Sequence, residues 1–146
     1  MLAEEILKSC IIECYMLVDF SAPMLDFARH RLKPFDGITQ YIREDFRSDA
    51  WTDGLRGLDA VVTMQAVHEV RHKRHVPQLY GRIFSVIRHG GYFLVADHYV
   101  TEKNARNSEL YFNSEEQRSV LTAAGFDRVT LVLDKGDMAL YRAYRP

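Results

Sequence analysis

Continuous apolar segments alternate with amphipathic ones along this chain of 146 residues, and they constrain its fold more than any other feature. The clearest apolar runs are YMLVD, LDAVVTMQAV and YFLVAD, which begin at residues 15, 58 and 92. Runs without polar alternation are typical of central strands in a parallel sheet, where both faces are covered. Strands that alternate with helices therefore predict an α/β fold, with an open, mostly parallel sheet and helices on both faces.

Apolar residues at helical spacing predict helices between these strands. Residues 2–9 carry acidic residues early and Lys8 late, as the helix dipole prefers. The next helix has Ser21 as its cap and Pro23 in its first turn. The apolar face predicted for this helix consists of Met24, Leu25, Phe27, Ala28 and Leu32.

The second half of the chain continues the same alternation. A helix over residues 76–87 is expected to stop at the HGG segment before the strand that begins at residue 92. The last helix is predicted to begin with a capping box of Ser114 and Gln117 and to end at Gly125, a C-cap glycine.

The remaining segments complete the predicted sheet. A strand is expected over residues 37–45, and two final strands are joined at KGD as a hairpin that adds an antiparallel edge. Residues 101–113 are polar and aperiodic, which makes them a candidate lid or substrate loop. Because no linker or repeat interrupts the chain, a single domain is predicted over residues 1–146.

Composition narrows the classes of partner and location. The formal net charge of −1 gives no reason to expect nucleic acid or an acidic membrane surface as a partner. The first residues are charged, and no apolar run is long enough to cross a bilayer. Cys10 and Cys14 are too few for a disulfide framework, so they are predicted to be small core residues of a reduced, cytoplasmic protein.

Polar residues gather at the predicted strand ends, where ligands bind in open α/β sheets. A carboxylate can accept hydrogen bonds from both ribose hydroxyls or from an exocyclic amine, and apolar neighbours can enclose an adenine ring. This pattern predicts a ligand that contains adenosine. The strand ends are Asp19-Phe20-Ser21, Asp45-Phe46, Met64-Gln65-Ala66 and Asp97-His98.

Five segments in this order resemble the class I S-adenosylmethionine-dependent methyltransferases of the small-molecule type. They read VDFSAPMLDFAR, REDF, LDAVVTMQAVHEV, GGYFLVADH and EEQRSVLTAAGF, and the resemblance extends from about residue 2 to the C-terminus. The terminal strand pair after AAGF is also typical of that Rossmann-like fold. The cofactor that the resemblance implies is S-adenosylmethionine.

The resemblance also implies roles for single residues. Asp19 would hold the ribose hydroxyls, and Phe20 and Met24 would flank the adenine. Asp45 would accept a hydrogen bond from the adenine amine, while the backbone N–H of Phe46 would donate to the ring. The methionine arm and the approach to the sulfonium methyl would be lined by Gln65 and Ala66.

The glycine-rich G-x-G-x-G motif of that family has no counterpart in the sequence. Such a loop lies roughly 20 residues before an acid of the Asp19 kind, at or before Met1. The first central strand and its loop are therefore expected to be missing, which would impair methyl transfer by this chain alone. Two inner strands would then expose unpaired edges. Either these strands pair directly, or another chain fills the gap, for example in a homo-oligomer or strand-exchanged dimer, or the monomer is poorly stable.

Methyl transfer to an unidentified small molecule requires a base only if the acceptor carries a proton. His98 and His68 follow strand ends and are the candidate catalytic residues, although each could equally be a surface or capping histidine. Tyr99 and Tyr111 could shape the acceptor pocket or serve as loop anchors.

Alternatives from other functional classes stay open. The chain could be a non-catalytic binding or assembly module that keeps the methyltransferase fold. Asp19 would also suit a nicotinamide dinucleotide, but Asp45-Phe46 and the terminal hairpin favour the methyltransferase.

The segment His68-Glu69-Val70-Arg71-His72 matches the zinc hydrolase pattern H-E-x-x-H. Its position at the exit of a buried strand differs from the long helix that this pattern needs, and no metal site is predicted. The overlapping basic segment RHKRH, residues 71–75, is interpreted as a solvated helix entry, with an anion site as the alternative.

Overall fold

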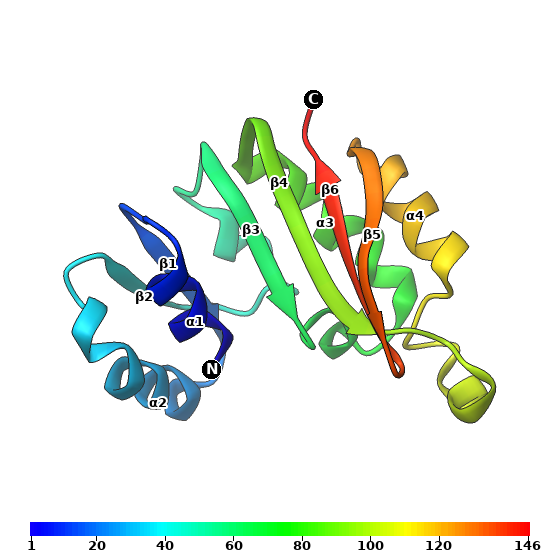
Figure 1. Ribbon diagram of the computed structural model, residues 1–146, viewed down its shortest axis with the longest axis horizontal. Coiled ribbons are helices and arrows are strands. Elements are labelled where there is room, and N and C mark those ends of the chain that lie inside the picture. The colour runs from blue at the N-terminus through cyan, green and yellow to red at the C-terminus, as the bar shows by residue number, and fades with distance from the viewer. The chain divides into compact units, whose positions relative to one another are not determined.

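The computed structural model describes residues 1–146, apart from the side chain of Lys103. The chain divides into two compact units, Met1–Asp53 and Gly54–Pro146, and each is described by itself (Figure 1). The predicted order of helices and strands is confirmed, whereas a single domain over residues 1–146 stays a prediction. No helix in the described part of the chain is long and apolar enough to cross a membrane.

The first unit places two helices beside a pair of parallel strands. Its regular elements are α1 (Leu2–Ser9), β1 (Tyr15–Asp19), α2 (Ala22–Leu32) and β2 (Thr39–Arg43). β1 pairs with β2 so that Asp19 lies opposite Arg43. The buried residues Ala3, Leu7 and Leu32 form a core cluster with partly buried side chains of the strands, including Tyr15 and Leu17.

The predicted apolar face of α2 is only partly buried. Leu25, Ala28 and Leu32 are buried, because spacings of three and four residues place them on one stripe of the helix. Met24 and Phe27 are 55% and 53% exposed on a neighbouring stripe, so the prediction that they belong to the buried face is wrong. The start of α2 is as predicted, since the Ser21 hydroxyl accepts a hydrogen bond from the backbone N–H of Met24 at 3.4 Å.

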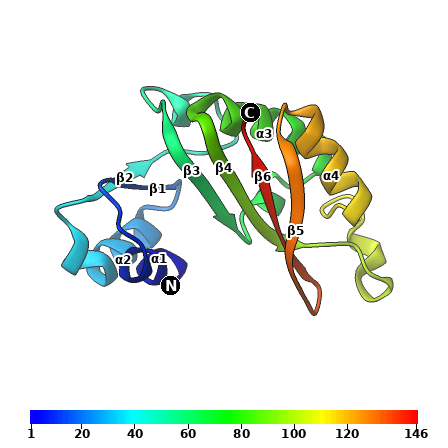
Figure 2. The same ribbon diagram turned by 45° about the horizontal axis from the view of Figure 1, so that its top comes forward.

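The second unit is a sheet with two helices on one of its faces (Figure 2). Its strand order is β3-β4-β6-β5, and β3 pairs with β4 in parallel while the other pairs are antiparallel. The buried Tyr80 and Phe93 rings meet edge to face, with centroids 5.2 Å apart. The regular elements are β3 (Leu58–Met64), α3 (Val76–Val86), β4 (Ile87–His98), α4 (Ser114–Ala123), β5 (Asp127–Lys135) and β6 (Met138–Tyr144).

These pairings confirm the α/β fold class, the parallel strand pairs and the antiparallel C-terminal hairpin. β1 and β3 belong to different sheets, and in the described residues each has a single strand neighbour. Within each unit, one edge of these strands therefore has no strand partner among the described residues.

Two boundaries differ from the prediction for local reasons. α3 ends at Val86 and β4 begins at Ile87, so HGG lies inside the strand, where Gly90 has a φ of +79°. The register of β3 against β4 shifts beside this segment, which marks a bulge that the glycines permit. The capping box of α4 uses Asn113 and Glu116 instead of Ser114 and Gln117, because the Asn113 carboxamide accepts the Glu116 N–H at 2.8 Å.

The prediction that Cys10 and Cys14 are core residues is wrong. Both thiols are free and exposed in the segment that links α1 to β1. Ile11 in the same segment is also fully exposed, so the apolar composition of this link does not reflect burial.

Gly125 provides a stability test with a matched control. It has a φ of +104°, and a Cβ at this position would lie 2.9 Å from the ring of Phe84, which packs against Phe126. Gly136 has a φ of +72° and open space around it. We expect Gly136→Ala to cost about 1 kcal/mol of unfolding free energy through backbone strain. Gly125→Ala should cost at least about 1 kcal/mol more in urea denaturation because the ring must move; equal losses would contradict this packing.

The hydrogen bonds of Glu4 are expected to make the stability of the first unit depend on pH. Lys8 donates to its carboxylate at 2.8 Å and Arg31 of α2 donates at 2.6 Å, and these bonds lower the pKa of Glu4 to about 2. Because the folded pKa is depressed, the stabilisation is present above the ordinary value of 4.5 and is lost as pH falls toward 2. As the pH is lowered from 6 to 3, the midpoint temperature of thermal unfolding should therefore fall more steeply for the wild type than for Glu4→Gln. Glu5→Gln, on the exposed side of α1, should keep the wild-type slope; an unchanged slope in Glu4→Gln would contradict the account.

Candidate functional site

The predicted adenosine-binding residues of the first unit share one edge of its sheet. Asp19 is the last residue of β1, and Asp45 and Phe46 follow the end of β2. Since β1 and β2 are parallel and Asp19 lies opposite Arg43, both carboxylates belong to the same end of the strand pair. The turn after β1 then leads into the first turn of α2, which carries Met24.

Asp19 is held in a turn that leaves part of its carboxylate available. Its Oδ1 accepts a hydrogen bond from the backbone N–H of Ser21 at 2.8 Å. The neighbouring Phe20 and Met24 are 54% and 55% exposed. A carboxylate acceptor beside exposed apolar side chains is suited to a ribose that carries a flat, apolar ring.

Asp45 is engaged by a neighbour that the sequence pattern did not reveal. Arg47 donates from Nε and Nη2 to the Asp45 carboxylate at distances of 2.6–3.0 Å, and the Arg47 backbone N–H donates to Oδ1 at 2.9 Å. The hydrogen bonds from the Arg47 side chain are the main reason that the pKa of Asp45 is lowered. An adenine amine bound at Asp45 would share this carboxylate with Arg47. The sequence clue to this pair is the i, i+2 spacing of Asp45 and Arg47, which is typical of an Asx turn.

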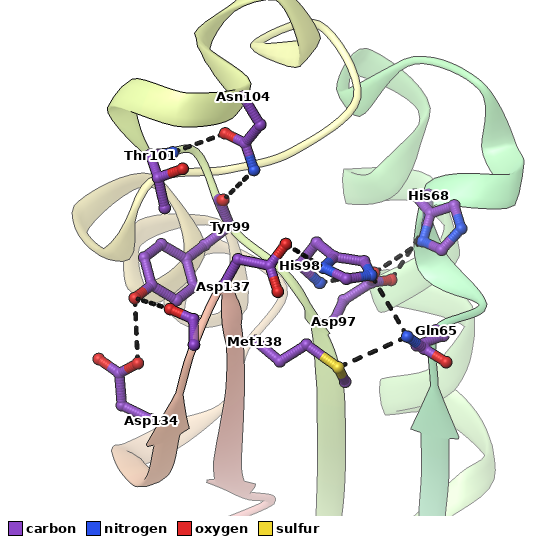
Figure 3. Close-up of polar contacts among 11 residues, drawn as sticks. Gln65, His68, Asp97, His98, Tyr99, Thr101, Asn104, Asp134, Asp137 and Met138 are labelled. Carbon is purple, nitrogen blue, oxygen red and sulfur yellow. Dashed lines mark hydrogen bonds and ion pairs between the residues drawn. The ribbon is translucent and has the colours of Figure 1, made fainter.

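In the second unit, Gln65 occupies a left-handed backbone conformation directly after β3, with a φ of +51°. Its backbone N–H donates to the carbonyl of Ala96 on β4 at 2.8 Å, which holds this turn against the neighbouring strand. The side-chain amide lies 3.2 Å from Nε2 of His98 and 3.5 Å from Sδ of Met138 (Figure 3). Ala66 follows in the same turn and is half-buried.

The carboxylate of Asp97, near the end of β4, accepts several hydrogen bonds. Nδ1 of His68 lies 2.7 Å from its Oδ1, and the backbone N–H of His68 donates to Oδ2 at 3.2 Å. The backbone N–H of His98 donates to Oδ1 at 2.8 Å. This carboxylate therefore ties the segment after β3 to the end of β4, as Figure 3 shows.

The two predicted bases, His68 and His98, are brought together. Their ring centroids are 6.1 Å apart, and the Tyr111 ring lies 5.7 Å from one and 5.6 Å from the other. His98 also places Nδ1 at 3.1 Å from Oδ2 of Asp137. This cluster of Gln65, His68, Asp97, His98 and Tyr111, called the polar cluster below, lies entirely within the second unit.

The tyrosines near the cluster have different surroundings. Tyr99 donates its hydroxyl to Asp134 at 3.0 Å and acts as an anchor on the C-terminal hairpin. Tyr111 instead contacts both histidine rings, and its place in an acceptor pocket stays a prediction. The predicted aperiodic loop contains 3₁₀-helical turns over Glu102–Asn107, with a kink at Asn104. A cavity of about 10 Å³ beside Asp97 and His98 has room for one water molecule only, so it does not hold a larger acceptor.

The H-E-x-x-H match lacks the helical geometry of a zinc site. Val67–Val70 form one 3₁₀ turn, and Arg71 then has a φ of +64°, so His68 and His72 do not lie one turn apart on a helix. His72 instead pairs with Glu109 at 2.8 Å. Among the described residues no group of three or more His, Cys, Asp or Glu side chains is arranged to hold a metal ion.

The basic segment of residues 71–75 is only partly solvated, because two of its side chains are paired, and an anion site at the others stays a prediction. Lys73 donates to the Glu116 carboxylate at 2.7 Å, and its backbone N–H donates to the carbonyl of Glu109 at 2.7 Å. Together with the pair of His72 and Glu109, these contacts fasten the segment to the region between the predicted loop and α4.

Comparison with known proteins is consistent with this arrangement. The chain matches the family model described as a methyltransferase domain over residues 2–95. No sequence among the curated proteins matches the chain.

Solved structures share the fold at low sequence identity. A putative methyltransferase in complex with the Haloferax volcanii Trm112 methyltransferase activator is 16% identical, with a TM-score of 0.77, over 99% of this chain and 76% of that one. An O-methyltransferase family protein from Burkholderia thailandensis is 16% identical, with a TM-score of 0.74, over 90% and 43%. PigF, solved with SAH, is 15% identical, with a TM-score of 0.70, over 91% and 48%.

The chain spans about half of the length of most solved structures that it matches, for example 43% of the Burkholderia thailandensis protein and 48% of PigF. The family model nevertheless covers more than half of the chain, and the shared fold agrees with it. The chain therefore belongs to the methyltransferase domain family and has the fold of the class I S-adenosylmethionine-dependent methyltransferases.

Proposed function

We propose that this chain binds S-adenosylmethionine and takes part in methyl transfer to a small-molecule acceptor. The observation that carries the proposal is the end of β1, where the Asp19 carboxylate is oriented by the Ser21 N–H beside the exposed Phe20 and Met24. These residue types stand in the order that the family resemblance requires. When bound, the cofactor supplies an activated methyl group on a sulfonium sulfur.

Each proposed cofactor residue lies at or just after the end of a strand, apart from Met24 in the first turn of α2. Asp19 accepts hydrogen bonds from ribose hydroxyls, and Phe20 and Met24 enclose the adenine. Asp45 accepts from the adenine amine while it keeps its pair with Arg47, and the Phe46 N–H donates to the ring. The contacts to the methionine arm are assigned to Gln65 and Ala66.

The chain's own work is to orient the partners and to exclude water. The sequence holds no G-x-G-x-G loop, so few groups are available for the amino and carboxylate ends of the cofactor. We therefore expect weak binding by this chain alone. If the acceptor carries a proton, His68 and His98 are the candidate bases.

Protein partners are a further part of the proposal. One of the solved structures with this fold is a complex between a putative methyltransferase and the Trm112 methyltransferase activator. β1 and β3 each have one strand neighbour in the described residues, which leaves a strand edge in each unit for another chain. A second copy of this chain and an activator protein are both candidates for this role.

Calorimetric titration with S-adenosylhomocysteine tests the cofactor assignment, because this product binds without being consumed. We expect saturable heat for the wild type and a loss of about tenfold or more in affinity for Asp19→Asn, since a charge-assisted acceptor is removed. Asp26→Asn is the matched control, because Asp26 is exposed on α2 and pairs only with Arg29 among the described residues.

The control should bind like the wild type. Absence of heat and of thermal stabilisation in the wild type at millimolar ligand would contradict cofactor binding by this chain. Equal affinity in Asp19→Asn would contradict the role given to Asp19.

A further inference from the structure

We propose that His68 is the proton acceptor of the polar cluster, that Asp97 is its positioning residue, and that His98 has a structural role. This inference rests on the proposed function, because it names the group that would take a proton from a methyl acceptor. It separates two histidines that the sequence pattern treats alike.

The Asp97 carboxylate defines which ring nitrogen of His68 carries a hydrogen. An ionised carboxylate only accepts hydrogen bonds, so Nδ1 of His68 must donate across the 2.7 Å contact. In the neutral imidazole, Nε2 then carries the free electron pair. Two backbone N–H groups also donate to Asp97, from His68 at 3.2 Å and His98 at 2.8 Å, so the carboxylate is itself held in place.

His98 has no comparable free nitrogen. Its Nδ1 lies 3.1 Å from the Asp137 carboxylate, which again requires this nitrogen to donate. Its Nε2 then accepts from the amide of Gln65 at 3.2 Å. Both ring nitrogens are therefore occupied, and a proton could reach Nε2 only after the Gln65 contact breaks.

Nε2 of His68 is open by contrast. In the described part of the chain its nearest charged neighbour is the Glu69 carboxylate at 3.5 Å, an ion-pair contact that forms only when the ring is protonated. A carboxylate has no hydrogen to donate, so it does not occupy the electron pair of Nε2. The His68 side chain is 22% exposed, and its ring is held edge-on by Tyr111 at 5.7 Å. The ring is therefore fixed in orientation while one basic atom stays accessible.

The proton step is balanced without any further reagent. The acceptor's X–H proton passes to Nε2 of His68, and the electrons of the X–H bond stay on X, which becomes the nucleophile. The resulting imidazolium keeps its Nδ1 hydrogen bond to the negative Asp97 carboxylate, which stabilises the positive charge. Nε2 afterwards releases the proton to water and the neutral ring is restored.

Nitrogen NMR on the ¹⁵N-labelled chain of residues 1–146 tests the assignment without a substrate. Two-bond correlations between ring protons and ring nitrogens report which nitrogen is protonated. We expect the neutral Nδ1–H tautomer for His68 in the wild type; a dominant Nε2–H tautomer would overturn the proposal. This measurement needs no variant, so it holds even if a substitution unfolds the protein.

Chemical modification tests the accessibility of the two histidines. Diethyl pyrocarbonate reacts at an unprotonated imidazole nitrogen, and mass spectrometry can follow the six histidines of the chain separately. We expect His68 to react about tenfold faster than His98, because His98 must first break a hydrogen bond. Faster reaction at His98 would overturn the proposal.

Two matched variants connect each histidine to its carboxylate. Asp97→Asn should slow modification of His68 severalfold, whereas Asp137→Asn should leave the His68 rate unchanged and alter only His98. Asp97→Glu, which keeps a carboxylate, should restore part of the His68 rate. Equal His68 rates in Asp97→Asn and the wild type, with both proteins folded by circular dichroism, would overturn the role of Asp97. A failed titration with S-adenosylhomocysteine would not change these rates, so the two proposals can fail separately.

Discussion

The carboxylate of Asp97 is the interaction on which the polar cluster of the second unit depends. It accepts from the His68 ring and from the backbone of both histidines, and so it joins the segment after β3 to the end of β4. Burying a carboxylate is costly unless donors compensate it, and here the donors are supplied by the groups that it orients. The same hydrogen bonds therefore orient the His68 ring and compensate the Asp97 carboxylate for its lost hydration.

The first unit uses the same principle at its own strand ends, with a different result. Asp19 is oriented by a single backbone N–H, whereas Asp45 is enclosed by the guanidinium and backbone of Arg47. Carboxylates that occupy equivalent strand ends thus differ in how much hydrogen-bonding capacity they keep. Asp19 carries the cofactor proposal because it keeps more of that capacity beside the exposed Phe20 and Met24.

Much of this fold follows from the sequence, because apolar periodicity and turn residues are local signals. The strand of residues 15–19, the cap at Ser21 and the left-handed Gly125, which follows the C-cap residue Ala124, were all predictable. The early start of β4 was not, because the HGG segment also suits a helix end and only the pairing with β3 selects the bulge. The exposure of Cys10 and Met24 depends on which side of a segment meets the core, which composition does not reveal.

The candidate site was predictable as residue types at strand ends, but not as contacts. Sequence order placed His68 and His98 at strand ends, yet only the folded chain shows that Asp97 contacts the ring of His68 and Asp137 the ring of His98.

Hydrogen–deuterium exchange with and without saturating S-adenosylhomocysteine tests the central claim, cofactor binding at the strand ends, most directly. The account predicts protection in peptides over residues 19–24, 45–47 and 65–68, with none in the hairpin over 127–137. Protection confined to the hairpin, or absent throughout, would contradict it.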